Sequence, residues 1–93
     1  MSLSFEWNDE KAASNFTKHG VSFELAARVF FDRDRIDRYD GRDGYEGEAR
    51  FIAVGLVGDV ELTVAYTMRG DTIRIISARR AERHEQVNYW KNR

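Results

Sequence analysis

This sequence contains no cysteine and no proline, and it has only two histidines in 93 residues. Without cysteine, the chain can form no disulfide bond and offers no thiolate for catalysis or metal binding. A zinc site with only two histidines would need carboxylate ligands, and no ligand spacing indicates one. We therefore expect neither a metal nor any other cofactor. Because proline is absent, none interrupts the helices and strands that the patterns below predict.

Long apolar runs are also missing. No stretch of 18 apolar residues exists, and the N-terminus lacks the charged-then-apolar pattern of a signal peptide. We therefore expect no membrane-spanning segment and, by default, a cytoplasmic protein. The length and the apolar content of 42% fit one globular domain over residues 1–93.

Charge is nearly balanced overall, at a net −1, but it is unevenly distributed. Residues 69–93 hold seven Lys or Arg against three acids, a local charge of +4, whereas acids dominate residues 32–48. A basic end and an acidic segment on one small body permit polyanion binding with limited promiscuity. The alternative is that these charges are ordinary solvated surface.

Capping signals predict two N-terminal helices joined by a tight turn. Asn8 is a suitable N-cap for a helix over about residues 9–18, which stops at Gly20. Ser22 is a suitable cap for a second helix over about residues 23–31, whose apolar residues recur at helical spacing.

The rest of the chain predicts a small sheet and a third helix. Residues 5–7 and 36–39 resemble short strands, and the remainder of residues 32–48 is expected to be loop. Alternating polarity predicts an antiparallel meander, with turns at Gly58 and Gly70 and strands at residues 51–56, 61–67 and 72–78. A helix follows over about residues 80–90. We expect an α+β fold in which the helices lie on one face of a small antiparallel sheet, a three-strand meander plus one or two short strands.

The third strand of the meander carries an unusual cation. Strict alternation places Ile73, Ile75 and Ser77 on one face, and it places Arg74, Ile76 and Ala78 on the other. Arg74 then lies on a half-buried face, where its charge needs a carboxylate or a ligand oxygen. One interpretation is an ion pair with Glu48 or Glu61; the other is a clamp on a phosphate.

Three further arginines bear on that clamp. Arg79 and Arg80 stand where the third strand ends and a helix begins, although Arg80 can equally serve as ordinary surface. Arg50 opens the first strand of the meander. The first and third strands run parallel to each other, so Arg50 lies far from Arg79, and convergence needs Arg74 or the loop as a bridge.

Proton transfer would need a group that titrates near neutral pH. His19 is the better of the two histidines for this task, because an imidazole ordinarily titrates in that range. The alternative role of His19 is to stabilise the end of the first helix. Glu24 and Glu48 are alternative bases.

Several blocks of the chain resemble the BrnT family, the toxins of BrnT–BrnA type II toxin–antitoxin systems. The blocks are Phe5-Glu6-Trp7, Lys11-Ala12 with Asn15, Lys18-His19-Gly20-Val21-Ser22-Phe23, Val29-Phe30, Arg50-Phe51-Ile52 with Val54-Gly55, Arg69-Gly70-Asp71, and Ile73-Arg74-Ile75-Ile76-Ser77-Ala78-Arg79, followed by Glu85. The resemblance covers nearly the whole chain. It implies a RelE-like fold and a ribonuclease toxin that blocks translation. It further implies a BrnA-like antitoxin that covers the site and through which the complex binds DNA. A homodimer or a toxin–antitoxin heterotetramer is a possible assembly.

On this interpretation we expect metal-independent cleavage through attack by the RNA 2′-hydroxyl. Arg74 and Arg79 would stabilise the phosphate, Arg50 would add a further clamp, and His19 or Glu48 would carry protons. The RNA would be held by further cations, Lys18, Arg69, Arg80 and Arg83. The alternative function is a non-catalytic interaction module whose basic face docks an acidic protein partner.

Overall fold

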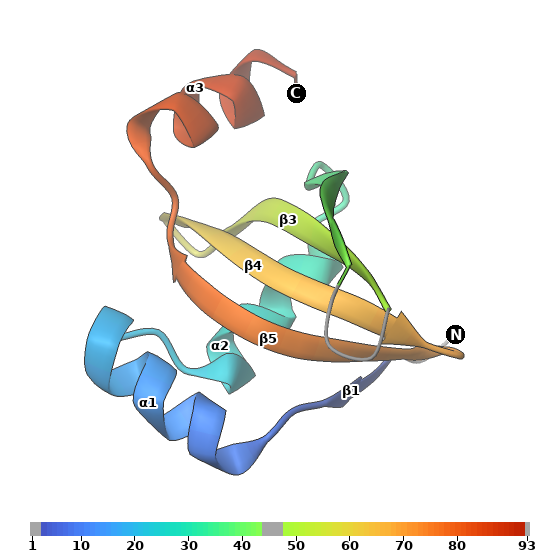
Figure 1. The fold of residues 1–93 in the computed structure, drawn as a ribbon. Helices are drawn as coiled ribbons and strands as arrows, with labels where there is room; N and C mark the ends of the chain where they lie inside the picture. Colours follow the sequence, from blue (N-terminus) through green and yellow to red (C-terminus); the bar gives the residue numbers. More distant parts are fainter. Residues whose placement is uncertain (1–2, 44–47, 93) are drawn as a thin grey trace.

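The computed structural model describes residues 3–43 and 48–92, which form a five-stranded sheet with helices on both faces (Figure 1). The strand order is β1-β5-β4-β3-β2. The strands are β1 (Ser4–Glu6), β2 (Ile36–Asp43), β3 (Ala49–Val57), β4 (Val60–Arg69) and β5 (Thr72–Arg80). The helices are α1 (Asp9–His19), α2 (Phe23–Ala27), the 3₁₀ helix η1 (Arg28–Phe31) and α3 (Arg83–Lys91).

The capping signals at the N-terminal helices are confirmed. The Asn8 side chain accepts a hydrogen bond from the Lys11 N–H at 3.0 Å, and Gly20 ends α1 with a left-handed φ of 71°. The Ser22 hydroxyl accepts from the Leu25 N–H at 3.0 Å. The second helix is shorter than predicted, because α2 gives way to the 3₁₀ turn η1 after Ala27. None of these helices has the length and apolarity that a bilayer-spanning helix needs.

The sheet is larger than the predicted meander. Strands β3, β4 and β5 form that meander, but β1 and β2 extend it to five strands, and β1 pairs with β5 in parallel. Strand β2 continues to Asp43, so the prediction of a loop from Asp40 to Asp43 was wrong. An edge strand tolerates a charged sequence because one of its sides faces solvent. Residues 44–47 of the expected loop lie outside the described residues.

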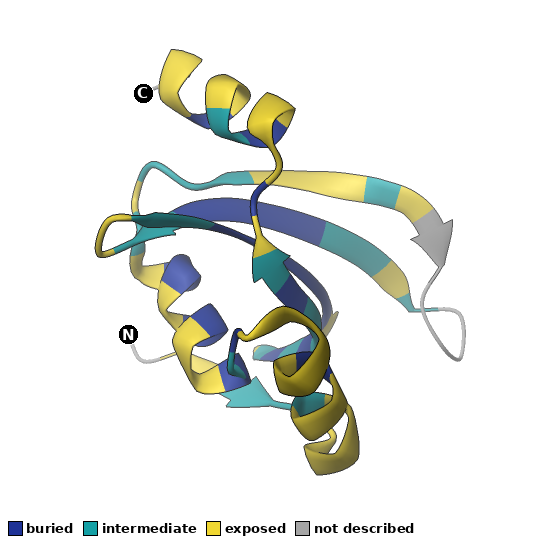
Figure 2. Ribbon diagram, turned by 90° about the vertical axis from the view of Figure 1, so that its left-hand side faces the viewer, coloured by how far each residue is buried: buried dark blue, intermediate teal, exposed yellow. Residues whose placement is uncertain are grey.

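The prediction that all helices lie on one face of the sheet was also wrong. Helices α1 and α2 cover one face, and α3 lies across the other (Figure 1). The central strands carry buried apolar residues on both faces, as neighbouring Val64 and Ala65 illustrate, so each face needs a cover. Figure 2 shows most of the burial at the sheet centre, whereas α1 is largely exposed.

A β-bulge in β5 explains a second difference from the sequence pattern. Tyr66 pairs with Ile75 and Ala65 pairs with Ser77, so Ile76 is an extra residue without a partner on β4. The residues after the bulge therefore exchange faces. Strict alternation predicted Ala78 on the face of Arg74. In the structure Ala78 instead packs with Ile75 in the core under α2. The same shift brings Arg79 to the face that α3 covers.

Asn15 fixes α1 against the edge of β5 beyond the end of β1. Its amide donates to the Ala78 carbonyl at 2.8 Å and to the Val21 carbonyl at 3.1 Å, and its carbonyl accepts from the Ala78 N–H at 3.1 Å. The side chain is buried and replaces the missing strand partner at this point. Three buried backbone groups therefore depend on one amide.

We predict that Asn15→Ala lowers the free energy of unfolding by roughly 3 kcal/mol, because it leaves three buried backbone groups unpaired. Asn15→Asp should be similarly destabilising at pH 7, since it places a carboxylate oxygen against two carbonyls. Urea unfolding followed by circular dichroism measures both changes. The control is Ser14→Ala on the exposed side of α1, expected within about 0.5 kcal/mol of wild type. An Asn15→Ala variant as stable as this control would contradict the assignment.

Candidate active site

Among the residues whose side chains the structure describes, five arginines share the face of the sheet that α3 partly covers. Strand partners project from the same face, and so do residues two apart on one strand. By this register the face, which we call the arginine face, carries Arg38, Arg50, Arg69, Arg74 and Arg79. The bulge in β5 is what places the last of these with the others.

One row of the arginine face crosses four strands. Arg50 on β3 pairs with Thr67 on β4, Thr67 pairs with Arg74 on β5, and Arg74 pairs with Glu6 on β1. The Thr67 hydroxyl is buried and has no hydrogen-bond partner among the residues that the structure describes. Arg50 and Arg74 thus flank one unsatisfied hydroxyl, and the role of Arg74 as a bridge between Arg50 and Arg79 stays a prediction.

Each arginine of this row faces an acid. The Arg74 Nη1 lies 2.5 Å from the Glu6 Oε2, and the Arg50 Nε lies 3.3 Å from the Asp40 Oδ2. The Glu48 or Glu61 partner expected for Arg74 was wrong, because β1 lies beside β5 and brings Glu6 closer. Both arginine side chains remain 27% exposed, so their remaining donors can reach solvent or a ligand.

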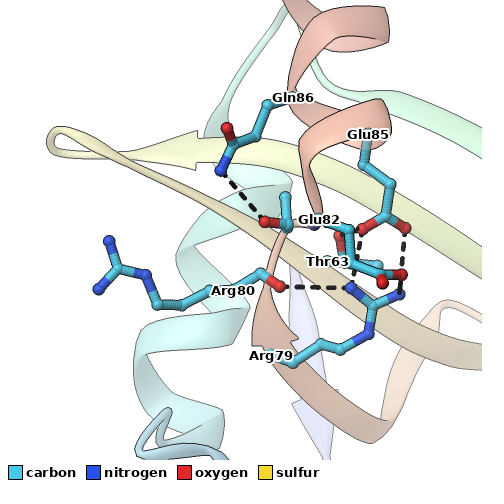
Figure 3. A network of polar contacts seen from close by, with 7 residues as sticks. Thr63, Arg79, Arg80, Glu82, Glu85 and Gln86 are labelled. Atoms are coloured by element: carbon cyan, nitrogen blue, oxygen red, sulfur yellow. Dashed lines mark hydrogen bonds and ion pairs between the residues drawn. The ribbon is translucent and has the colours of Figure 1, made fainter.

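The next row but one carries Arg79, which the buried carboxylate of Glu85 holds. Val54 pairs with Thr63 and Thr63 pairs with Arg79, four residues along β4 from the first row, or roughly 13 Å. Arg79 donates through Nη1 to the Glu85 Oε1 at 2.7 Å and through Nη2 to the Oε2 at 3.1 Å (Figure 3). Because Arg79 and Arg50 lie on different rows, the sequence-based expectation that they are far apart is confirmed.

Glu85 is the anchor of this network. It is buried, and it also accepts from the Thr63 hydroxyl at 3.0 Å and from the Glu82 N–H at 2.8 Å. Burial alone would raise the pKa of Glu85, but the hydrogen bonds from Arg79, the Glu82 N–H and Thr63 together lower that pKa to about 2. Glu85 in return raises the pKa of Arg79. Both groups stay charged at neutral pH, and a carboxylate of such low pKa is a weak base.

The geometry of the pair leaves part of Arg79 available. Glu85 occupies the end of the guanidinium, and the Arg80 carbonyl accepts from Nη1 at 3.3 Å. The Nε–H has no partner in the described part of the chain, and Nη2 has a second N–H on the same side, with the Glu82 Oε1 3.7 Å from Nη2. Together they form a second fork that matches two oxygens of a phosphate. The Arg79 side chain is 36% exposed, so this fork is accessible.

A histidine and a cavity adjoin this pair. His84 is exposed on α3, and one of its ring nitrogens lies within 4.8 Å of a carboxylate oxygen of Glu85. Beneath α3 lies a cavity of about 320 Å³, lined by Ile36, Arg38, Val54, His84, Glu85 and Asn88. A histidine, a fixed arginine and a cavity therefore meet at one end of the arginine face.

Donor atoms of Glu82, His84 and Glu85 lie within 4.8 Å of one another, close enough to hold a metal ion. Arg79 already supplies the positive charge at this point, since it binds both oxygens of Glu85 and lies 3.7 Å from the Glu82 Oε1. A metal ion would have to displace that guanidinium or bind against its charge.

Several residues expected at the site lie elsewhere. Lys18 and His19 line a separate cavity of about 320 Å³ between α1 and β5. Glu48 binds Arg69 at the far end of the arginine face, at 2.9 and 3.2 Å. The Arg80 side chain points away from Glu85 (Figure 3), and Arg83 is exposed at the start of α3. The structure thus unites Arg50, Arg74 and Arg79 on one face, where Glu48 lies at the end remote from Arg79 and His19 lies in the other cavity.

Sequence reasoning missed four residues of this region, namely Arg38, Thr63, Glu85 as a partner of Arg79, and Asn88. Arg38 lies in a segment that was expected to be a short strand and loop, and Thr63 is one of the polar residues that alternate with apolar ones along β4. A signal existed for Glu85, because Glu82 and Glu85 stand three apart at a helix start, as in a capping box.

A comparison with protein families finds a match. Residues 7–85 match the family model described as the ribonuclease toxin BrnT of type II toxin–antitoxin systems. Among curated proteins, none matches the sequence closely enough to count as a relative. The matched range includes every residue of the arginine face described above and ends at Glu85.

We predict that Glu85→Gln lowers the free energy of unfolding by roughly 2 kcal/mol at pH 7, since it leaves the Arg79 charge without its carboxylate. The pKa of Glu85 is about 2 in the folded protein against an ordinary 4.5, so its contribution is complete above the ordinary value. The contribution is lost as the pH falls towards 2. The difference between variant and wild type should therefore shrink between pH 5 and about 2.

Urea unfolding at several pH values measures this difference. Asp71→Asn, at an exposed turn, is the control, and its small effect should not depend on Glu85. A gap for Glu85→Gln that stays constant down to the acid limit would contradict the ion pair as its cause.

Proposed function

We propose, because this chain belongs to the BrnT family of ribonuclease toxins of type II toxin–antitoxin systems, that its arginine face binds RNA and cleaves it beside Arg79. Membership of the family implies endoribonuclease activity and an antitoxin partner. The observation that carries the proposal is the fixed guanidinium of Arg79, which Glu85 holds at one end while a second donor fork remains accessible.

The proposed reaction uses the nucleophile that RNA itself contains. The 2′-oxygen attacks the adjacent phosphorus, the bond from phosphorus to the 5′-oxygen breaks, and a 2′,3′-cyclic phosphate remains. The fork of Arg79 stabilises the charge that accumulates on the phosphate oxygens, and it needs no reorganisation because Glu85 already orients it. Arg74 and Arg50, four β4 residues or roughly 13 Å from the row of Arg79, act as clamps on a phosphate further along the RNA.

One proton must leave the 2′-hydroxyl and one must reach the 5′-oxygen. The sequence pointed to His19 or Glu48, but these lie outside the region of Arg79. We assign the proton transfers to His84, which lies beside the Arg79–Glu85 pair. Glu85 is too weak a base for this role and acts as the group that positions Arg79.

The remaining cations attract RNA without taking part in the chemistry. Arg69 extends the arginine face, and Lys18, Arg80 and Arg83 add positive charge outside it. A BrnA-like antitoxin is the proposed partner, with DNA reached only through it and with a toxin–antitoxin heterotetramer or a toxin homodimer as the assembly. A RelE-like fold and a cytoplasmic place of action, where messenger RNA is translated, belong to the same proposal.

A second function is favoured by one observation. Four of the five arginines of the face already bind carboxylates, namely Glu6, Asp40, Glu48 and Glu85. The same cations can dock an acidic segment of a protein partner, without any cleavage. The first prediction below separates the two functions, because only the ribonuclease requires the Arg79 fork for a chemical step.

We predict that Arg79→Lys lowers the rate of RNA cleavage at least about 100-fold, because lysine keeps the charge beside Glu85 but loses the second fork. Cleavage of labelled single-stranded RNA by purified protein measures the rate, and circular dichroism checks the fold. Arg33→Lys, an exposed arginine on the turn before β2, is the control and should cleave like wild type. An Arg79→Lys variant of unchanged rate would remove Arg79 from the mechanism.

We also predict that cleavage does not require a divalent metal ion, since Arg79 supplies the positive charge at Glu82 and Glu85. The rate in excess EDTA should equal the rate in Mg²⁺ within about a factor of two. Loss of activity in EDTA that Mg²⁺ or Mn²⁺ restores would instead assign a metal to the donor group of Glu82, His84 and Glu85.

A further inference from the structure

We infer that the cavity under α3 binds a guanine base of the RNA, next to the phosphate held by Arg79. This inference rests on the proposed function and adds a base preference to it. The cavity measures about 320 Å³, which is at the small end of the range for ligand pockets. Three of its lining residues come from β2 and β3, and the other three come from one side of α3.

The floor of the cavity suits a flat apolar group. Ile36 on β2 and Val54 on β3 are strand partners, so their side chains lie side by side on the arginine face. Both are buried or half-buried, and both belong to the core under α3. A nucleobase laid on this floor would lose its contact with water on one face, as bases do in single-stranded RNA recognition.

The rim of the cavity presents mainly hydrogen-bond donors. Arg38 is exposed, and its guanidinium has no partner among residues 3–43 and 48–92. The Asn88 Oδ1 accepts from the Asn92 Nδ2 at 3.1 Å, while no described group pairs with the Asn88 Nδ2. The only carboxylate on the wall, Glu85, is already occupied by Arg79, Thr63 and a backbone N–H.

A rim of donors selects a base edge with two neighbouring acceptors. Guanine offers such an edge in its O6 and N7, which a guanidinium contacts in a bidentate manner. Adenine places an amino donor beside its N7, and cytosine presents an amino donor as well. Arg38 and Asn88 are therefore the specificity-determining residues.

The cavity is joined to the phosphate site by a shared wall. Glu85 lines the cavity and holds Arg79 at the same time. The row beneath runs from Ile36 through Val54 and Thr63 to Arg79, so the floor of the cavity and the arginine stand on one line across the sheet. A base in the cavity therefore fixes which phosphate lies at Arg79, and cleavage should occur beside guanosine.

The test combines a cleavage experiment with a binding experiment. Wild type, Arg38→Ala and Asn88→Ala are incubated with a random-sequence RNA pool, and the new ends are mapped by sequencing. Wild type should enrich guanosine at one position next to the cut, and each variant should reduce that enrichment about tenfold. Arg33→Ala, the matched exposed arginine, should keep the wild-type preference.

The binding arm does not depend on cleavage. Titration with GMP, AMP, CMP or UMP, followed by methyl NMR of Ile36 and Val54, should show shifts that saturate earliest with GMP, and Arg38→Ala should remove this advantage. Cleavage without base preference, together with equal binding of the four nucleotides, would overturn the inference. Selective GMP shifts in a protein that cleaves no RNA would support the inference and count against the proposed function. Cleavage with a preference that survives in both variants would also overturn it.

Discussion

The position of one unpaired residue in β5 decides what the arginine face contains. In an uninterrupted strand Arg74 and Arg79 would point to opposite sides of the sheet, because they are separated by an odd number of positions. The bulge at Ile76 changes the parity, so Arg79 arrives opposite Thr63 and under Glu85. The same change directs Ala78 into the core on the α1 and α2 side of the sheet, where Asn15 binds its backbone. Without this irregularity the cations of the strand would be divided between two layers.

Glu85 then determines how strongly Arg79 is fixed. A surface ion pair between flexible side chains contributes little and orders little. Here the carboxylate is buried and takes four hydrogen bonds, and its helix is fixed in turn by Tyr89, which is fully buried and donates to the Asp32 Oδ2 at 2.6 Å. The packing of α3 on the sheet thus fixes Glu85, and Glu85 in turn fixes the orientation of the Arg79 guanidinium. A preorganised cation of this kind is what stabilisation of a phosphate transition state requires.

Much of this architecture could be predicted from local signals. The caps at Asn8, Ser22 and Gly20 and the alternation along β4 depend on neighbouring residues, and a single sequence displays them. Strand position singled out Arg50, Arg74 and Arg79, and the match over residues 7–85 confirms the family resemblance. The distribution of helices over two faces was not predicted. The apolar residues of α3 are sparse and do not indicate that this helix packs on the sheet through a fully buried Tyr89.

The candidate site was harder to predict, because its members meet through register. No residue pattern near Ser77 indicates a bulge. Glu6 and Arg74, which form an ion pair, are 68 positions apart in the chain, so the sequence does not show that they meet. His19 was favoured for its ordinary chemistry, whereas its position on α1 places it in another cavity. His84 was the less favoured histidine, because the sequence does not show that the placement of α3 brings it to Glu85. Residue type limits the candidates, and strand pairing selects among them.

The short strand β1 has a consequence for the electrostatics of the whole face. Its last residue, Glu6, neutralises Arg74 and also lies 3.7 Å from Arg69, so one carboxylate serves two cations. An anion that engages Arg74 competes with Glu6 and weakens the attachment of a strand only three residues long. By thermodynamic reciprocity, detachment of β1 strengthens anion binding by the same factor. The N-terminal edge of the sheet therefore acts as a built-in competitor for whatever the arginines bind.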